Sequence, residues 1–285
     1  MIKSREADEH CGIAQSAAVL GDWWSLLVLR EVARGHRRFD ELAGELDISR
    51  KVLTERLGHL VEHGVLAKRP YSDRPPRHEY VLTPAGHGLL PVLVAMQDWA
   101  DRWVLGDGTL TALSPDGAEP ARTRDLPGSR VPDGLFLPST RGEPLDVVGP
   151  TAWTVLFTYP ATGGGKGEQW RRIPGTAGCT LENRLFRDAW PDFAEAGATV
   201  YGLSTQLPEE QAAFAAAEDL PFPLLSDVDL ELTAALRLPT FRGAHQLRHK
   251  RAVLVVDADR VVRHSIYPVA DIAAAVDHAL ALVRE

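Results

Sequence analysis

The feature that most constrains the fold is a change of sequence pattern partway along this chain of 285 residues. Before residue 105, apolar residues recur with the spacing of amphipathic helices. Residues 105–130 are rich in Gly, Pro, Ser and Asp and lack a sustained apolar period, which is typical of a linker. Beyond residue 130, short apolar runs alternate with helical stretches, as in α/β domains. The sequence therefore predicts two domains, at 1–104 and 131–285, joined by a linker at 105–130.

Composition excludes several classes of protein. The chain is 45% hydrophobic and 25% charged, which is ordinary for a globular protein. No apolar run approaches the ~18 residues of a membrane span, and the charged N-terminus is unlike a signal peptide. Two cysteines cannot form a disulfide framework, so we expect a reducing cytoplasm and reactive rather than structural thiols. The net charge is −8, but residues 1–104 hold 14 Lys and Arg against 15 Asp and Glu, which leaves room for a local basic face.

The N-terminal domain is expected to be an α+β winged helix-turn-helix. Gly21-Asp22 separates its first two amphipathic helices, Asp40 is the expected cap of the third, and Ser49 is the expected cap of the fourth. Two strands joined by an arginine-bearing turn follow. In order, the predicted elements are helices at 11–20, 23–33, 38–46 and 50–63 and strands at 65–71 and 79–82.

In a winged helix-turn-helix, the second helix of the motif enters the major groove and the wing reaches the DNA backbone. Residues on the exposed side of the predicted helix 50–63 and at the tip of the wing are therefore the candidate DNA contacts. They are Ser49, Arg50, Lys51, Thr54, Arg74 and Arg77. The alternative is a helical packing module with a surface hairpin, which the clustering of these cationic residues argues against.

A last helix follows Pro84 and carries apolar residues along one side. A long apolar stripe outside a small core usually packs against a second copy, so we expect a homodimer that reads a two-fold, palindromic operator in double-stranded DNA. The stripe comprises Leu89, Leu93, Met96, Trp99 or Ala100, and Trp103.

Several blocks in register resemble HxlR-type transcriptional regulators over about residues 10–104. They are Cys11-Gly-Ile, Leu20-Gly-Asp-Trp-Trp24, Leu26-Leu-Val-Leu-Arg30-Glu, Arg38-Phe-Asp-Glu-Leu42, Leu53-Thr-Glu-Arg-Leu57 and Pro75-Pro-Arg-His-Glu79-Tyr-Val-Leu-Thr-Pro84. The resemblance implies a dimeric winged helix on palindromic DNA. It also implies that Cys11 stands where redox-sensing members carry the reactive thiol, although a structural role for Cys11 remains open.

The second cysteine, Cys179, follows a glycine and precedes a helical pattern that runs to about Asp192. The N–H groups and dipole of a helix N-terminus favour the thiolate, which is the species that attacks peroxides. Around Cys179, the order of strands and helices predicts an α/β thioredoxin-like domain. Its predicted strands are 155–159, 198–204, 251–257 and 261–267, and its further helices are 208–218 and one from Asp271.

Residues 131–285 resemble peroxiredoxins of the AhpC/TSA type, in particular the bacterioferritin-comigratory or PrxQ-like branch. The matching blocks are Tyr159-Pro160, Thr176-Ala-Gly-Cys179-Thr180, Phe186-Arg-Asp188, Gly202-Leu-Ser-Thr205, Pro221-Phe-Pro-Leu-Leu-Ser-Asp227 and Lys250-Arg251. The resemblance implies that Cys179 is the peroxidatic cysteine, that the Thr176 hydroxyl hydrogen-bonds peroxide, and that the Arg251 guanidinium stabilises the thiolate and polarises the O–O bond. Fixed donors of this kind suit a reaction that develops negative charge on oxygen.

The chain departs from the peroxiredoxin pattern in two places. About a dozen extra residues separate Pro160 from Thr176. The PrxQ-like branch often carries a resolving cysteine five residues after the peroxidatic one, whereas here that position is Arg184. Cys11 is consequently the one internal thiol that can reduce a sulfenic acid on Cys179.

The sequence thus favours a peroxide-responsive transcriptional regulator, with thioredoxin or a low-molecular-weight thiol as its reductant. Two alternatives stay open: a thiol-dependent peroxidase tethered to DNA, and a non-redox binding or dimerisation module. No cofactor or metal is expected, because the Gly163–Gly167 run lacks the Ser or Thr of a P-loop and the histidines lack the spacing of metal ligands.

Overall fold

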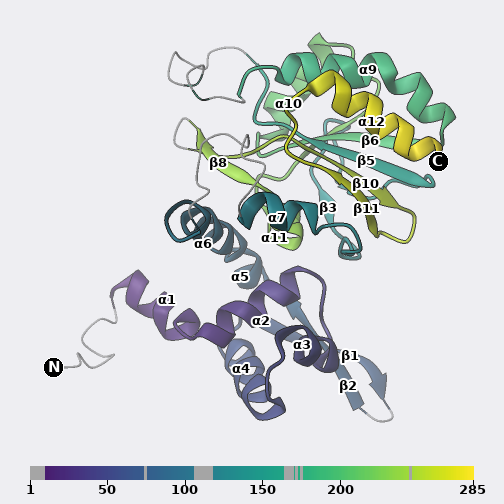
Figure 1. Cartoon of the computed structure of the whole chain (residues 1–285). Helices are drawn as coiled ribbons and strands as arrows, with labels where there is room; N and C mark the ends of the chain where they lie inside the picture. The colour runs from purple at the N-terminus through teal and green to yellow at the C-terminus, as the bar shows by residue number, and fades with distance from the viewer. Residues whose placement is uncertain are drawn as a thin grey trace. The chain divides into compact units, whose positions relative to one another are not determined.

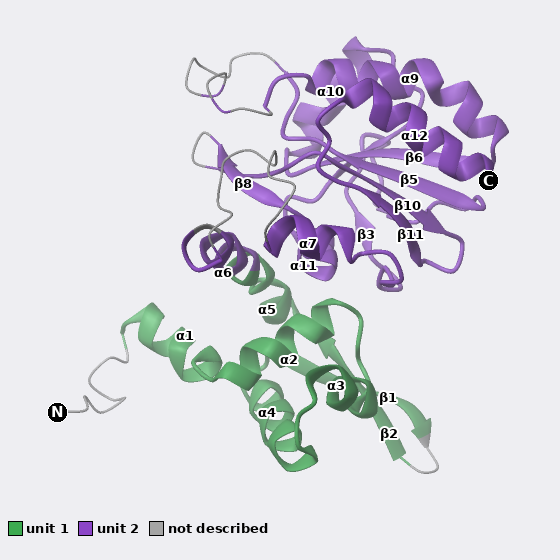
Figure 2. Cartoon of the chain, in the orientation of Figure 1, with its two compact units in different colours: residues 1–93 green, residues 94–285 purple. Residues whose placement is uncertain are grey.

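The computed structural model describes residues 10–73, 76–105, 118–163, 170, 173, 176–243 and 246–285. The chain forms two compact units, Met1–Leu93 and Val94–Glu285, which Figure 2 distinguishes by colour. Of the described helices, none alone has the length and apolar character to cross a membrane. The first two helices satisfy that test only when joined across an 80° bend.

Unit 1 has the order of elements that the sequence predicts for a winged helix-turn-helix. Its helices pack around a core of aliphatic side chains that includes Val28, Leu29, Leu42, Leu53 and Leu57. The antiparallel strands β1 and β2 follow as the wing. The elements are α1 (Gly12–Leu20), α2 (Trp23–Ala33), α3 (Phe39–Leu46), α4 (Arg50–Glu62), β1 (Leu66–Asp73), β2 (Pro76–Leu82), α5 (Pro84–His87) and α6 (Leu90–Trp103), the last of which continues into unit 2.

Helix caps in unit 1 agree with the sequence at two helices and differ at one. Asp22 accepts hydrogen bonds from the backbone N–H groups of the first turn of α2, and Ser49 accepts one from Val52 in α4. The expected cap of α3 at Asp40 is wrong, because the helix already begins at Phe39 and Arg38 occupies the N-cap position. Glu41 supplies the capping acceptor instead, by receiving the Arg38 N–H at 2.9 Å.

Unit 2 contains a five-stranded mixed sheet in the order β11-β10-β5-β6-β7. Strands β5, β6 and β7 run parallel, whereas β10 pairs antiparallel with both β5 and β11. Helices α9, α10 and α12 lie on one face of the sheet, and α7 and α11 lie on the other (Figure 1). These elements are α7 (Ala118–Arg124), β5 (Trp153–Thr158), α9 (Cys179–Glu195), β6 (Ala198–Ser204), α10 (Pro208–Ala217), β7 (Leu224–Ser226), α11 (Glu231–Leu236), β10 (Ala252–Asp257), β11 (Val262–Ile266) and α12 (Ile272–Arg284).

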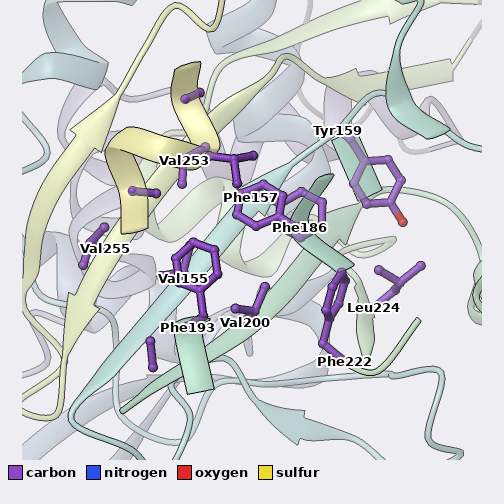
Figure 3. Packing of buried hydrophobic residues seen from close by; sticks show 14 of the residues in the cluster. Val155, Phe157, Tyr159, Phe186, Phe193, Val200, Phe222, Leu224, Val253 and Val255 are labelled. Atoms are coloured by element: carbon purple, nitrogen blue, oxygen red, sulfur yellow. The ribbon is translucent and has the colours of Figure 1, made fainter. Parts of the chain in front are cut away.

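Side chains of the central strand β5 point alternately to the two faces of the sheet, and a hydrophobic core lies on each face. Phe157 points into the cluster beneath α9 and α12, whereas its neighbour Leu156 points into the cluster around α11. The ring of Phe157 stacks on Phe186 of α9 with 4.0 Å between their centroids (Figure 3). This packing fixes the N-terminal half of α9 on the sheet.

Several short elements of unit 2 lack an equivalent in the sequence prediction. Two antiparallel hairpins are formed by β3 (Phe136–Leu137) with β4 (Leu145–Asp146) and by β8 (Thr240–Gly243) with β9 (Gln246–His249). Helix α7 lies within the stretch that composition assigns to the linker. Helix α9 extends past the predicted end at Asp192 and contains Pro191 within its span.

Candidate redox site and nucleic-acid interface

Cys179 is the first residue of α9, and the glycine before it adopts the backbone conformation that starts the helix there. Gly178 is the N-cap and has a φ of 101°, a conformation that L side chains rarely adopt. A Cβ atom there would also lie 2.8 Å from Cδ1 of Ile272. The glycine therefore lets the chain turn into the helix directly before the thiol.

Arg251 faces the sulfur of Cys179 from the segment that joins β9 to β10. Its Nη2 atom lies 3.2 Å from Sγ and also donates to the carbonyl of Ala177 at 2.7 Å. Both Cys179 and Arg251 are buried, at 4% and 6% exposure, so their interaction is shielded from water. A permanent positive charge thus lies beside the sulfur, an arrangement that can stabilise negative charge on it.

Glu182 is a site residue whose role the sequence analysis missed. It lies three residues after Cys179 on α9, is buried, and accepts a hydrogen bond from Nη1 of Arg251. Burial raises the pKa of Glu182 to about 7, although the Arg251 guanidinium opposes the shift. The sequence could have indicated this role, because Cys179 and Glu182 are three residues apart on a predicted helix and therefore share a face. Glu182 orients the guanidinium that contacts Sγ.

Thr176 is buried next to the thiol, but its hydroxyl is turned to the backbone. Oγ1 lies 2.8 Å from the carbonyl oxygens of both Trp170 and Ile173, which share its one hydrogen, and among the described residues it has no hydrogen bond with Cys179. The carbonyl of Thr176 lies 3.5 Å from Sγ. A hydroxyl has two acceptor lone pairs, so Oγ1 can still accept a hydrogen bond from a bound peroxide.

The segment that carries Arg251 is anchored by three consecutive cationic or polar side chains. Besides the contact of Arg251 with Glu182, Nζ of Lys250 lies 2.6 and 2.9 Å from the two carboxylate oxygens of Glu119 in α7. Nε2 of His249 lies 2.7 Å from the Thr233 hydroxyl, which in turn donates to Asp227. The partners come from distant parts of the chain, so sequence spacing alone does not reveal them.

In unit 1, the candidate DNA contacts lie on α4 and β2. Lys51 and Thr54 are exposed on α4, and Arg77 is exposed on β2. Arg50 is also exposed, but its Nη1 pairs with Asp40 at 2.9 Å and its guanidinium lies over the Phe39 ring. Ser49 serves as the N-cap, and Arg74 lies outside the described residues.

Helix α6 exposes an apolar stripe that differs in part from the predicted one. Leu89 and Leu93 pack against the core of unit 1 instead of joining the stripe. Side chains spaced three or four residues apart form the exposed face, namely Val92, Met96, Trp99 and Trp103, with Trp103 the most exposed at 66%. The exposed stripe therefore keeps the predicted Met96, Trp99 and Trp103, and Val92 takes the place of Leu89 and Leu93.

The N-terminal and C-terminal parts of the chain match two different protein families. Residues 19–107 match the HxlR-like helix-turn-helix family, and residues 170–265 match the AhpC/TSA family. An HTH-type transcriptional regulator of Synechocystis is 40% identical over 100 residues, covering 35% of this chain and 74% of the relative. A putative peroxiredoxin of Mycobacterium tuberculosis is 36% identical over 161 residues, covering 55% of this chain and 95% of the relative. The chain belongs to both families.

Two further proteins from Mycobacterium tuberculosis are similar to parts of this chain. An HTH-type regulator of Mycobacterium tuberculosis is 42% identical over 92 residues, which is 32% of this chain and 58% of that relative, so the chain spans little more than half its length. The crystal structure of peroxidoxin BcpB from Mycobacterium tuberculosis is 33% identical, with a TM-score of 0.46 over 55% of this chain and 96% of that one. An HxlR-like regulator domain and a peroxiredoxin domain are thus fused in one polypeptide.

The two thiols lie in different units of this HxlR–peroxiredoxin fusion. Cys11 is exposed at the N-cap of α1, whereas Cys179 is buried at the start of α9, and both are free. The insertion after Pro160 lies largely outside the described residues, but its described residues Trp170 and Ile173 contact the Thr176 hydroxyl through their carbonyl oxygens.

One cluster in the HxlR-like unit has the composition of a metal site. The ligand atoms of Glu31, His36 and Glu45 lie within 4.8 Å of one another. However, Arg30 and Arg34 donate to the two carboxylate oxygens of Glu31 at 2.6 and 2.8 Å. Burial raises the pKa of Glu31, but the hydrogen bond with His36 and the two arginine charges outweigh burial and lower it to about 2. Because Arg30, Arg34 and His36 already occupy the Glu31 carboxylate, we interpret the cluster as an internal ion-pair network and not as a metal site.

Proposed function

We propose that this protein is a peroxide-responsive transcriptional regulator in which Cys179 is the oxidant-reactive thiol. The observation that carries the proposal is the contact between Nη2 of Arg251 and Sγ of Cys179 at the first residue of α9. A buried guanidinium and a helix N-terminus both favour negative charge on the sulfur. Because this site is fused to an HxlR-like domain, oxidation of Cys179 can alter the binding of that domain to DNA.

In the proposed reaction, the Cys179 thiolate attacks one oxygen of a hydroperoxide. An S–O bond forms and the O–O bond breaks, so that Cys179 becomes a sulfenic acid and the peroxide leaves as an alkoxide or hydroxide that takes up a proton. The sulfur loses two electrons and the peroxide gains them. Arg251 stabilises the charge on both the attacking sulfur and the departing oxygen, and Thr176 accepts the peroxide hydrogen bond.

A thiol then reduces the sulfenic acid, with release of water and formation of a disulfide. Thioredoxin or a low-molecular-weight thiol is the external candidate, and Cys11 is the internal candidate, from the same chain or a partner copy. The exposure of Cys11 supports its access to other thiols.

On the DNA side, we propose that a homodimer binds a palindromic operator. The exposed apolar stripe on α6 supports a contact between two copies, because isolated patches of large apolar side chains on a helix usually have a partner. The proposed DNA contacts lie on or just before α4 and in the predicted wing. They are Ser49, Arg50, Lys51, Thr54, Arg74 and Arg77.

The decisive experiment measures operator affinity at fixed salt before and after stoichiometric peroxide, for the parent protein and for Cys179→Ser. We expect a change of at least about fivefold in the parent and none in the variant. A Cys11→Ser variant serves as the control for oxidation at the second thiol. Equal affinities of the reduced and oxidised parent protein would refute the sensing function.

The same contact between Arg251 and Cys179 also supports a second function, a thiol peroxidase that the HxlR-like domain places on DNA. Multiple turnovers of peroxide with added thioredoxin or low-molecular-weight thiol, without any change in operator affinity, would favour this enzyme. A non-redox module is less well supported, because an inert site would not need a buried guanidinium directed at a buried thiol.

A further inference from the structure

We propose that two buried ion pairs, Lys250–Glu119 and Arg122–Asp101, which helix α7 links to each other and the peptide bond of Lys250 links to Arg251, couple the oxidation state of Cys179 to helix α6. We call these five residues the ionic relay. The inference rests on the proposed function, and it adds the route by which the thiol acts on the HxlR-like part of the chain.

The relay starts at the thiol itself. In the reduced state, the Arg251 guanidinium faces two acids, Cys179 and Glu182. Oxidation of Cys179 to a sulfenic acid adds an oxygen atom to a sulfur that is only 4% exposed and that lies against the Arg251 guanidinium. Because buried groups in a close-packed interior cannot absorb an added atom without displacement, Arg251 and its backbone must shift.

Lys250 passes this displacement to α7. It is the covalent neighbour of Arg251, and its Nζ contacts both carboxylate oxygens of Glu119 at 2.6 and 2.9 Å. Both side chains are buried, at 6% and 5% exposure, and the Tyr267 hydroxyl also donates to Glu119. Separating a buried ion pair leaves an uncompensated charge, which is strongly unfavourable, so Glu119 follows Lys250 when the backbone moves.

Helix α7 joins this pair to a second one. Glu119 and Arg122 are three residues apart on α7, and Arg122 donates through Nη1 and Nη2 to the two carboxylate oxygens of Asp101 at 2.9 and 2.6 Å. Both partners of this fork are 9% exposed. Nε of Arg122 also donates to the carbonyl of Arg237, which fixes the direction of the guanidinium. The bidentate geometry makes the pair sensitive to rotation as well as to distance.

Asp101 lies in α6, and this helix is where the two units join. The match to the HxlR-like family includes α6, yet its residues from Val94 onward belong to unit 2. The helix is continuous from Leu90 to Trp103, so a displacement of Asp101 reaches unit 1 through the helix itself. The helix also carries the apolar stripe that we propose as the contact between two copies.

The test uses the double variant Arg122→Gln/Asp101→Asn in the full-length protein. It neutralises both partners of one relay pair and leaves the residues around Cys179 unchanged. The matched control is Arg260→Gln/Asp146→Asn, which removes another bidentate pair of unit 2, at 2.8 Å for each contact, outside the relay. For each protein we measure the rate constant for peroxide oxidation of Cys179 and the operator affinity in the reduced and oxidised states.

We expect all three proteins to react with peroxide at the same rate. The parent and the control should change operator affinity at least about fivefold on oxidation, whereas the relay variant should change by less than about twofold. A relay variant that responds as the parent does would overturn the relay and leave the proposed function standing. A parent that is oxidised without any change in affinity would overturn the proposed function itself.

If the double variant does not fold, hydrogen exchange of the parent decides the question. Oxidation should then accelerate exchange in α7 and in residues 94–103 of α6, and the same treatment of Cys179→Ser should not. Unchanged exchange in both helices of the oxidised parent would contradict the relay.

Discussion

Arg184 is clamped to Glu218 by two hydrogen bonds, from Nε at 2.6 Å and from Nη2 at 2.9 Å. The contact ties the second turn of α9 to the residue that ends α10. Arg184 stands where the PrxQ-like branch often carries a resolving cysteine. This position therefore supplies a tether between two helices instead of a second thiol.

Because residue 184 is not a thiol, the proposed reaction of Cys179 with peroxide should depend on an added reductant. Without added thiol, we expect each chain to consume about one equivalent of peroxide rapidly, because a sulfenic acid must be reduced before Cys179 reacts again. Peroxide consumption, with a mass map of the two cysteines, measures this. The Cys179→Ser variant should show no rapid phase. Continued rapid consumption by the parent without thiol would contradict the assignment.

Substitution Arg251→Lys should slow the oxidation of Cys179 by roughly a hundredfold. Lysine keeps the positive charge but loses the planar fork that contacts Sγ, the Ala177 carbonyl and Glu182 together, and removal of one donor to a developing negative charge typically has an effect of this size. Stopped-flow competition for peroxide gives the rate constant. Arg242→Lys, at an exposed pair with Asp98, is the matched control and should react as the parent does.

Substitution Gly178→Ala should destabilise unit 2 by about 1–3 kcal/mol, because it combines an unfavourable φ with overpacking. The added Cβ would meet Ile272 at 2.8 Å. Gly197→Ala separates the two effects, because Gly197 has a φ of 71° but open space around its Cα. Chemical denaturation should show a smaller loss for Gly197→Ala. Equal losses would mean that the contact with Ile272 relaxes at no cost.

The stabilising effect of His36 should fade as the pH rises. The hydrogen bond to Glu31 raises the pKa of His36 above its ordinary value of 6.5. The proton is therefore bound more tightly in the folded state, so the contribution is complete below pH 6.5 and is lost as the pH rises through the folded-state pKa. Differential scanning calorimetry of His36→Gln should show its largest deficit in mildly acidic buffer. In a Glu31→Gln background, the same substitution should show no such trend, because the carboxylate that faces His36 is absent.

Substitution Lys51→Ala should weaken operator binding and lower the slope of log affinity against log salt by about 1, as expected for the loss of one phosphate contact. Lys51 is exposed at the start of α4, where a helix-turn-helix approaches DNA. The control Arg284→Ala also removes one positive charge, but from α12 of unit 2, where Arg284 pairs with Asp192 of the same unit. If the two variants lower the slope equally, Lys51 does not contact a phosphate.

Long periodic segments were predictable from the sequence. The helices of unit 1 and strands such as Trp153–Thr158 carry a pattern of burial that local composition already indicates. The start of α9 was predictable too, because Gly178 and the following apolar pattern signal a helix N-terminus. The position of Cys179 at that terminus followed from the same signal.

The ion-pair partners were not predictable, because they depend on contacts between distant segments. Glu119 lies in a stretch whose composition indicates a linker, yet it is the buried counterion of Lys250. Met96, Trp99 and Trp103 of the predicted α6 stripe are exposed. Leu89 and Leu93 were wrongly included because they are equally apolar, and only packing against the core of unit 1 removes them from the surface. The cap of α3 was placed at Asp40 because Asp is a common N-cap residue, but the helix begins at Phe39 and its N-cap is Arg38.

The burial of Glu119 sets a limit on how the peroxiredoxin domain can be shortened. A fragment that begins at residue 131 would retain Lys250 in its interior but lack the acid that neutralises it, together with the rest of α7. Such a fragment is expected to fold poorly or to recruit a foreign anion, whereas one that begins ahead of Val94 keeps both Glu119 for Lys250 and Asp101 for Arg122.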